Sequence, residues 1–310
     1  MGEPKKIIGI EIDHTRNTVT ISQQRYIKSI LERENLTDCN HVSTPMDPKV
    51  KILPNPEGNE GSRSNYFAQL LGELQFLANA TRPDIAFTVN RLSSYTANPT
   101  MEHITALKWI LWYLKGTKSY GIKYSNSHGN NDDLFHGFFH GFADAAYANT
   151  DDYKSTAGYV FIAAGGAITW RSKKQTFTAL STTEAEYVAL SEAAREAYWL
   201  RNLYEELGIK QESPTTIKGN NNGSISMARN PQFHNRAKHI AVRYHRIQDA
   251  INDGIIKIDS CQDPEQTADV LTKALHCFKH RKHIAEMGMK STLEGTWLCG
   301  SFSLPFREVF

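Results

Sequence analysis

Residues 181–187 read Ser-Thr-Thr-Glu-Ala-Glu-Tyr and open the stretch that decides the fold. From about residue 182 to residue 207, small and apolar side chains recur on one helical face: Ala189, Ala193, Ala197, Leu200, Leu203 and Leu207. This spacing predicts a long helix with one buried face. Ser181 or Thr182 with a glutamate nearby is typical of a helix start.

Strand patterns lie on both sides of this helix. Three predicted strands precede it, at 137–144, 157–164 and 167–171. After it we expect a strand at 214–218, a short helix from Gly223, a helix at about 238–253, a strand at 255–259 and a helix at about 264–274. This order predicts an α/β unit in which helices flank a five-stranded mixed sheet.

The first 125 residues follow a different pattern. Two β-branched runs, Lys6–Asp13 and Thr18–Ser22, with a turn at Arg16-Asn17 predict a hairpin. Helical spacing follows at 24–33, 66–80 and 102–115. Residues 125–133 are polar throughout and have turn chemistry, so we place a domain boundary there. The predicted units are 1–125 and 135–290, and 291–310 is expected to be a disordered tail.

Bulk composition excludes several classes of protein. The 310 residues are 40% hydrophobic and 22% charged, with a formal net charge of +2, so any basic surface for nucleic acid must be local. The four cysteines are scattered without a C-x-x-C pair, which argues against structural zinc and disulfides and fits a reducing compartment. No apolar run reaches the ~18 residues of a membrane span, and the start lacks a secretory pattern. We expect a soluble intracellular protein, cytoplasmic or nuclear, that does not enter a membrane.

Three carboxylates stand at positions that suit a metal site. Asp144 ends the first strand of the predicted sheet, Glu186 lies one turn into the long helix, and Asp269 lies early in the last helix. Each has a structural alternative as turn residue, cap or partner of the helix dipole, and capping explains Glu184 better than it explains Glu186. The order Asp, Glu, Asp along this series of predicted strands and helices indicates a metal site more strongly than any one of the three residues does.

These residues belong to longer motifs. The motifs are Phe142-Ala-Asp-Ala, Lys154-Ser-Thr-Ala-Gly-Tyr-Val-Phe, Gly166-Ala-Ile-Thr-Trp-Arg-Ser-Lys-Lys-Gln, Leu180-Ser-Thr-Thr-Glu-Ala-Glu-Tyr, Asn230-Pro-Gln-Phe-His, Lys238-His-Ile, Arg243-Tyr-His and Ala268-Asp-Val-Leu-Thr-Lys. Together they resemble the ribonuclease H domain of a Ty1/copia-type retrotransposon Pol polyprotein. The upstream motifs are Gly9-Ile-Glu-Ile, Ser22-Gln-Gln-Arg-Tyr-Ile, Thr44-Pro-Met-Asp-Pro, Thr81-Arg-Pro-Asp-Ile-Ala-Phe and Tyr113-Leu-Lys-Gly-Thr. They resemble the end of the reverse transcriptase and its connection, so the resemblance covers about residues 1–290.

The resemblance implies a site in which four carboxylates hold two divalent ions, usually Mg²⁺. In that family the ions promote cleavage of the RNA strand of RNA–DNA hybrids. Three positions map to Asp144, Glu186 (with Glu184 as the alternative) and Asp269. The fourth, after a short strand, maps to Asn220 in Ile217-Lys-Gly-Asn-Asn-Asn-Gly-Ser-Ile225, and no aspartate lies between Leu207 and Gln248. An amide offers a neutral oxygen where the family has a charge, so an incomplete metal site and impaired cleavage are expected.

Basic residues near these motifs are candidates for nucleic-acid contact. They are Lys173, Lys174, Arg236, Lys238, His239 and Arg243, with a solvated face as the equal alternative. A zinc site at His234, His239 and His245 is not favoured, because the spacing is wrong and no cysteine lies near. The basic cluster Phe278-Lys-His-Arg-Lys-His283 is expected at the surface.

Polymerase activity is not expected. The acidic pairs Asp132-Asp133 and Asp151-Asp152 lie in polar loops rather than between the hydrophobic strands of a Tyr-x-Asp-Asp motif. With the rest of the polymerase missing, apolar faces of residues 1–125 are expected to lack a partner. Three hypotheses remain open: a truncated Pol product whose ribonuclease H is impaired, a module that binds hybrid or other retrotransposon proteins without cutting, and an adapted host or effector protein.

Overall fold

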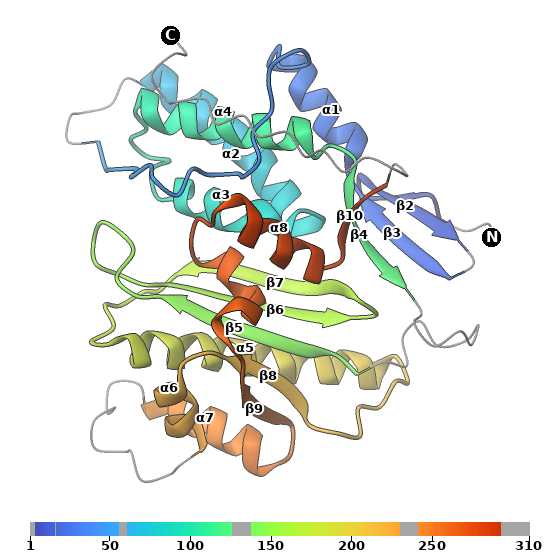
Figure 1. Cartoon of the computed structure of the whole chain (residues 1–310), viewed down its shortest axis with the longest axis vertical. Helices are drawn as coiled ribbons and strands as arrows, with labels where there is room; N and C mark the ends of the chain where they lie inside the picture. Colours follow the sequence, from blue (N-terminus) through green and yellow to red (C-terminus); the bar gives the residue numbers. More distant parts are fainter. Residues whose placement is uncertain (1–3, 16, 56–60, 126–137, 230–240, 293–310) are drawn as a thin grey trace.

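The structure, a computed structural model, describes residues 4–15, 17–55, 61–125, 138–229 and 241–292. It contains two five-stranded sheets with helices packed between and around them (Figure 1). The expected tail lies outside the described residues except for its first two positions. No helix of the described residues is long and apolar enough to cross a bilayer.

The second sheet has the order β7-β6-β5-β8-β9. Its strands are β5 (His140–Ala146), β6 (Thr156–Ala163), β7 (Gly166–Lys174), β8 (Thr215–Gly219) and β9 (Ile256–Ser260). β5, β6 and β7 pair antiparallel, whereas β5, β8 and β9 pair parallel. The predicted five-stranded mixed sheet is therefore confirmed, and its order and strand directions define a ribonuclease H-like α/β fold.

Helices cover both faces of this sheet (Figure 1). On one face lie α5 (Thr182–Glu206), α6 (Asn222–Arg229) and α7 (Ala241–Asn252). The long helix begins as predicted, with Ser181 accepting a hydrogen bond from the Glu184 amide. The alanines on its inner face let the helix approach β5 closely, and Ala185, Ala189, Ala193 and Ala197 are all buried.

The segment after β9 differs from the prediction. The helix expected at 264–274 is wrong: two short 3₁₀ turns, η4 (Asp263–Glu265) and η5 (Thr267–Leu271), precede a true helix, α8 (Cys277–Glu286). Buried Gln266 explains the difference, because its Nε2 donates to the Ala143 carbonyl at 3.0 Å. A tertiary hydrogen bond to β5 thus sets the backbone here in place of helical bonding.

The first sheet has the order β1-β2-β3-β4-β10 and is antiparallel. Its strands are β1 (Lys6–Ile7), β2 (Ile10–Thr15), β3 (Thr18–Ser22), β4 (Tyr120–Ser125) and β10 (Met289–Ser291). The predicted hairpin is confirmed, since Thr15 pairs with Thr18. The edge strand β10 comes from beyond α8, so the chain returns after the second sheet to complete the first.

The helices of the N-terminal part share a core with the second sheet. They are α1 (Gln24–Arg33), α2 (Gly61–Ala80), η1 (Pro83–Ile85), α3 (Ala86–Ser93) and α4 (Met101–Gly116). Leu70, Leu74 and Leu107 belong to one buried cluster with Val160 and Leu271. The expectation that these apolar faces lack a partner is therefore wrong. The division into units at 1–125 and 135–290 stays a prediction.

Two motifs of the N-terminal part form a buried ion network. Arg82 and Asp84, from Thr81-Arg-Pro-Asp, pair at 2.7 Å with both side chains fully buried. Thr117, which ends Tyr113-Leu-Lys-Gly-Thr, accepts a hydrogen bond from Arg82 at 2.6 Å, and the Tyr113 hydroxyl donates to Asp84 at 2.7 Å. His280 of α8 stacks edge-on against Tyr113. These motifs therefore fix the place where α8 docks.

The acidic pair in the β5–β6 loop also has a structural role. Asp151 accepts hydrogen bonds from Arg91 at 2.9 Å and from the Tyr95 hydroxyl at 2.5 Å, both in the N-terminal part. Asp152 pairs with Lys174 at 2.7 Å. These contacts support the view that the pair is not a polymerase site. Asp132-Asp133 lies outside the described residues.

Candidate metal centre

Asp144 lies at the centre of the candidate site, near the carboxyl end of β5. It is 1% exposed, and its Oδ2 accepts a hydrogen bond from the Thr272 hydroxyl that follows η5. Burial raises the pKa of Asp144 to about 6, with Lys273 opposing the shift and Asp269 adding to it. Burial thus makes Asp144 harder to ionise than an exposed aspartate, and the nearby Lys273 partly offsets this effect.

Glu186 approaches Asp144 from α5. Its Oε2 accepts a hydrogen bond from the amide of Ala145, the residue after Asp144, at 3.1 Å. Burial, followed by the charge of Asp144, raises the pKa of Glu186 to about 9. The alternative, Glu184, instead accepts the Leu180 amide at 2.8 Å at the helix start. The structure thus places Glu186 with Asp144 and leaves Glu184 as a cap.

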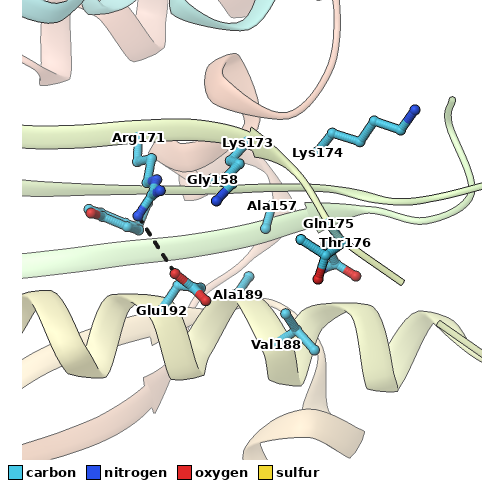
Figure 2. A pocket seen from close by; sticks show the side chains of 11 residues that line it. Ala157, Gly158, Arg171, Lys173, Lys174, Gln175, Thr176, Val188, Ala189 and Glu192 are labelled. Carbon is cyan, nitrogen blue, oxygen red and sulfur yellow. Dashed lines mark ion pairs between the residues drawn. The ribbon is translucent and has the colours of Figure 1, made fainter. Parts of the chain in front are cut away.

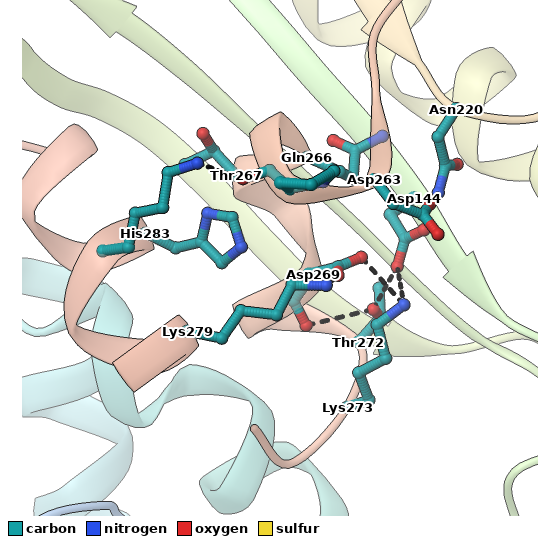
Figure 3. Close-up of polar contacts among 12 residues, drawn as sticks. Asp144, Asn220, Asp263, Gln266, Thr267, Asp269, Thr272, Lys273, Lys279 and His283 are labelled. Carbon is teal, nitrogen blue, oxygen red and sulfur yellow. Dashed lines mark hydrogen bonds and ion pairs between the residues drawn. The ribbon is translucent and has the colours of Figure 1, made fainter. Parts of the chain in front are cut away.

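Asp269 joins the two from η5. It is 1% exposed, and its carboxylate pairs with Lys273 at 2.8 Å and with Lys279. Figure 3 shows the Lys273 ammonium between Asp144 and Asp269. Asp269 lies on the Asp144 side of the sheet, because the Lys273 ammonium group contacts both carboxylates.

Asn220 stands just beyond β8, level with Asp144. Gly141 pairs with Ile217 and Phe142 with Lys218, so the same register continued by two residues sets Asp144 beside Asn220. The Asn220 amide nitrogen donates to Asp263 Oδ1 at 2.7 Å (Figure 3). Its Oδ1 is buried and accepts no hydrogen bond from the described residues. The Asp263 carboxylate thus lies next to Asn220, and the assignment of Asn220 to the fourth ligand position stays a prediction.

The donor set fits a hard divalent ion in its chemistry. Three carboxylates and an unpartnered amide oxygen are the ligands that Mg²⁺ prefers. Their present spacing is set by protein partners, and within the described residues no three His, Cys, Asp or Glu side chains are arranged to hold one ion. Lys273 and Lys279 lie on the carboxylate oxygens where an ion would bind.

Four contributors to the site were not predicted from sequence. They are Thr272, Lys273, Lys279 and Asp263, which contact Asp144, Asp269 or Asn220 directly. Lys279 belongs to the basic cluster that we expect at the surface, yet both histidines of that cluster, His280 and His283, are buried. Thr272 and Lys273 stand in the Ala268-Asp-Val-Leu-Thr-Lys motif, so their nearness to Asp269 was the available clue.

The candidate nucleic-acid residues are only partly described. Lys173 and Lys174 end β7, where with Arg171 they line a pocket of about 70 Å³ against α5 (Figure 2). Arg171 pairs there with Glu192 at 3.7 Å. The pocket is too small for a base. Arg236, Lys238 and His239 lie outside the described residues, and of Arg243 only the backbone is described. Of the histidines considered for zinc, His234 and His239 lie outside the described residues, and of His245 only the backbone is described.

Gly158 lets η5 approach the sheet at this site. It pairs with Asp144 across β5 and β6, and a Cβ there would lie 2.8 Å from Leu271 Cβ and from Thr272 Cγ2. We expect Gly158→Ala to lower the free energy of unfolding by about 1–3 kcal/mol, because η5 must move off the sheet. Urea unfolding would measure this. Gly72→Ala is the matched control, since no atom lies within 4 Å of its Cβ; an equal effect in both would contradict the proposed contact.

The fold and the clustered carboxylates define the class as a ribonuclease H-like protein. The Pol polyprotein from transposon TNT 1-94 of Nicotiana tabacum is 36% identical over 283 residues, and that from transposon RE1 of Arabidopsis thaliana is 38% identical over 283 residues. These matches cover 89% and 91% of this chain. The chain belongs to the family of retrovirus-related Pol polyproteins of Ty1/copia-type transposons. It spans only about a fifth of these relatives, 21% and 19%.

Other comparisons gave shorter or looser matches. Secreted RxLR effector protein 161 of Plasmopara viticola is 41% identical over 135 residues, which is 43% of this chain and 90% of that protein. Ribonuclease H1 of Halobacterium salinarum matches 44% of this chain and 95% of its own, at 15% identity and a TM-score of 0.34. The structure of the foamy viral protease-reverse transcriptase in complex with RNA/DNA hybrid matches 83% of this chain and 29% of its own chain. The sequence identity is 14% and the TM-score is 0.46. No protein-family model matches the chain.

Proposed function

We propose that this chain is a C-terminal piece of a retrotransposon Pol polyprotein whose ribonuclease H-like unit binds RNA–DNA hybrid and cuts the RNA strand slowly. One observation carries the proposal. Asp144, Glu186 and Asp269 come from three distant segments and interact in one buried cluster. Asn220 follows the end of β8, next to Asp144 in the continued register of β5 and β8. Neither core packing nor capping accounts for such a concentration of buried acid.

A divalent ion would be held by Asp144, Glu186 and Asp269. When bound, it supplies an activated water and steadies charge on the leaving oxygen. The protein's own groups keep the ligands in place: the Ala145 amide holds Glu186, and the Thr272 hydroxyl holds Asp144. Asn220 adds a neutral oxygen only, which leaves the set one charge short of four carboxylates and supports a low rate.

A cleavage assay with a matched variant tests the proposal. With labelled hybrid and Mg²⁺ or Mn²⁺, we expect slow cleavage of the RNA strand by the full chain. Asp144→Asn should lower the rate by about tenfold or more, because the ion loses a charged ligand. Hybrid affinity should change little, because phosphate contacts dominate it.

Asp13→Asn is the control, because Asp13 is exposed in β2 of the other sheet. It should leave both the rate and the affinity unchanged. A rate that Asp144→Asn does not alter would show that this cluster is not where cleavage occurs.

A second candidate is a module that binds without cutting. Two features favour it: the expectation that Asn220 replaces a metal-binding carboxylate, and the likeness to a protein named as a secreted effector. The same assay separates the candidates. Hybrid affinity without any cleavage would support a nucleic-acid-binding module, in which Lys173 and Lys174 are the first residues to replace. Absence of hybrid affinity would support protein contacts, including contacts with other retrotransposon proteins.

A further inference from the structure

Two lysines reach into the carboxylate cluster. Lys273 Nζ lies 2.8 Å from Asp269 Oδ1 and 3.6 Å from Asp144 Oδ2, and Lys279 Nζ pairs with Asp269 Oδ2. The two aspartate side chains are 1% and 2% exposed, so water screens these contacts little. Both oxygens of Asp269 and one of Asp144 therefore already face a positive charge.

The charges of the cluster show why these lysines matter to an ion. Fully ionised, Asp144, Glu186 and Asp269 carry three negative charges at most, because the raised pKa of Glu186 leaves that group protonated at neutral pH until a cation binds. The two ammonium groups carry two positive charges. That balance leaves about one negative charge for an incoming cation, whereas two divalent ions bring four positive charges. A divalent ion on Asp144 and Asp269 must therefore displace an ammonium group or share its ligand with one.

Lys273 is the lysine that an ion would displace. It contacts both aspartates, whereas Lys279 contacts only Asp269. Its side chain is 40% exposed, and its flexible stem gives the ammonium group a route to solvent. Its contacts lie on the same oxygens that a metal would use.

We infer that Lys273 is an internal counter-ion that competes with divalent cations for Asp144 and Asp269. This inference rests on the proposed function for the identity of the ligands, and it concerns their occupancy rather than cleavage. In the absence of an ion, Lys273 pairs with both buried aspartates and so links the segment after η5 to β5. When an ion binds, its affinity is lowered by the need to move this side chain.

Cation titration of the full chain without nucleic acid tests the inference. Binding of Mn²⁺ and Mg²⁺ would be followed by calorimetry and by the loss of the free Mn²⁺ resonance. We expect Lys273→Met to tighten binding by roughly tenfold or more, because a unit charge within 4 Å of both ligands is removed. Lys28→Met is the control, since Lys28 pairs with Glu32 on the surface of α1, and it should leave the dissociation constant unchanged.

Thermal unfolding gives an independent readout. Without a divalent ion, Lys273→Met should melt at a lower temperature, because Asp269 and Asp144 lose a partner. With Mn²⁺ its melting temperature should rise more than that of the unmodified chain, because tighter binding to the folded state stabilises it more. Lys28→Met should show the rise of the unmodified chain.

The outcomes separate this inference from the proposed function. Equal or weaker cation affinity in Lys273→Met, with binding still measurable, would overturn the inference and leave the proposed site intact. Absence of Mn²⁺ binding by both proteins, with no change of melting temperature, would overturn the inference and the metal-dependent function together. Tighter binding with a larger thermal rise supports the inference whatever the cleavage rate.

Discussion

Exchanging the amide and the carboxylate of Asn220 and Asp263 is expected to raise cleavage of hybrid RNA by about a hundredfold or more. The double variant Asn220→Asp/Asp263→Asn restores a charge beside Asp144 while keeping the 2.7 Å hydrogen bond between the two side chains. A bound ion contributes several kcal/mol to the transition state, and each ~1.4 kcal/mol is tenfold in rate. The measurement is the initial rate of cleavage of a labelled hybrid at a saturating concentration of Mg²⁺.

The single variants are the controls for this exchange. Asn220→Asp alone sets a new carboxylate against Asp263, and like charges at that distance raise the pKa of one of them. We therefore expect it to increase the rate less than the double variant does. Asp263→Asn alone should give no increase, because the charge beside Asp144 is still missing. A double variant no faster than the unmodified chain would show that Asn220 does not stand at a metal position.

Replacing Arg82 by methionine is expected to lower the free energy of unfolding by about 3–5 kcal/mol. Arg82 is fully buried, and its loss leaves the Asp84 carboxylate in the core with the Tyr113 hydroxyl as its remaining side-chain donor among the described residues. Burial by itself would raise the pKa of Asp84, but Arg82 outweighs burial and holds that pKa below its ordinary value. Since a domain is stable by about 5–15 kcal/mol in total, the loss should be visible in urea unfolding of the full chain.

Two comparisons sharpen this test. Arg25→Met removes an exposed arginine that lies 3.9 Å from Glu11, and a surface pair of this kind contributes about 0–1 kcal/mol. The Arg82 contribution should also fall at low pH. A group with a lowered pKa stabilises the fold above its unfolded pKa and loses that effect as the pH falls through its folded value. A loss below 1 kcal/mol for Arg82→Met at neutral pH would contradict the structural role assigned to this motif.

The regular elements of the ribonuclease H-like unit could be predicted because their patterns are local. The period of about 3.6 residues in α5 and the short β-branched runs of β5 to β7 depend on neighbours in sequence. The positions of Asp144 and Glu186 follow from those elements, because a strand end and the next helix turn have fixed side-chain directions. The structure sets Glu186 beside Asp144 and Glu184 at the helix start, and the metal role of Glu186 stays a prediction.

The segment from Gln262 to Glu286 could not be predicted in the same way. A helix was expected across Asp269, yet the Gln266 side chain bonds to β5, more than 120 residues earlier in the chain. Periodicity gives no information about such a contact. The basic cluster around Lys279 likewise predicts a surface position. Only the docking of α8 on Arg82, Asp84 and Tyr113 brings Lys279 to Asp269.

From the sequence alone came the family, the order of the strands in the ribonuclease H-like unit with its long helix, and the prediction that Asp144, Glu186 and Asp269 hold metal with Asn220 in the fourth place. These are properties of single residues and of short periodic runs. Only the tertiary structure decided what surrounds them: Lys273 and Lys279 on the aspartates, Asp263 on Asn220, and β10 closing the other sheet. Charge and hydrogen bonding act over a few ångströms in space, so these partners become visible only when distant segments are packed together.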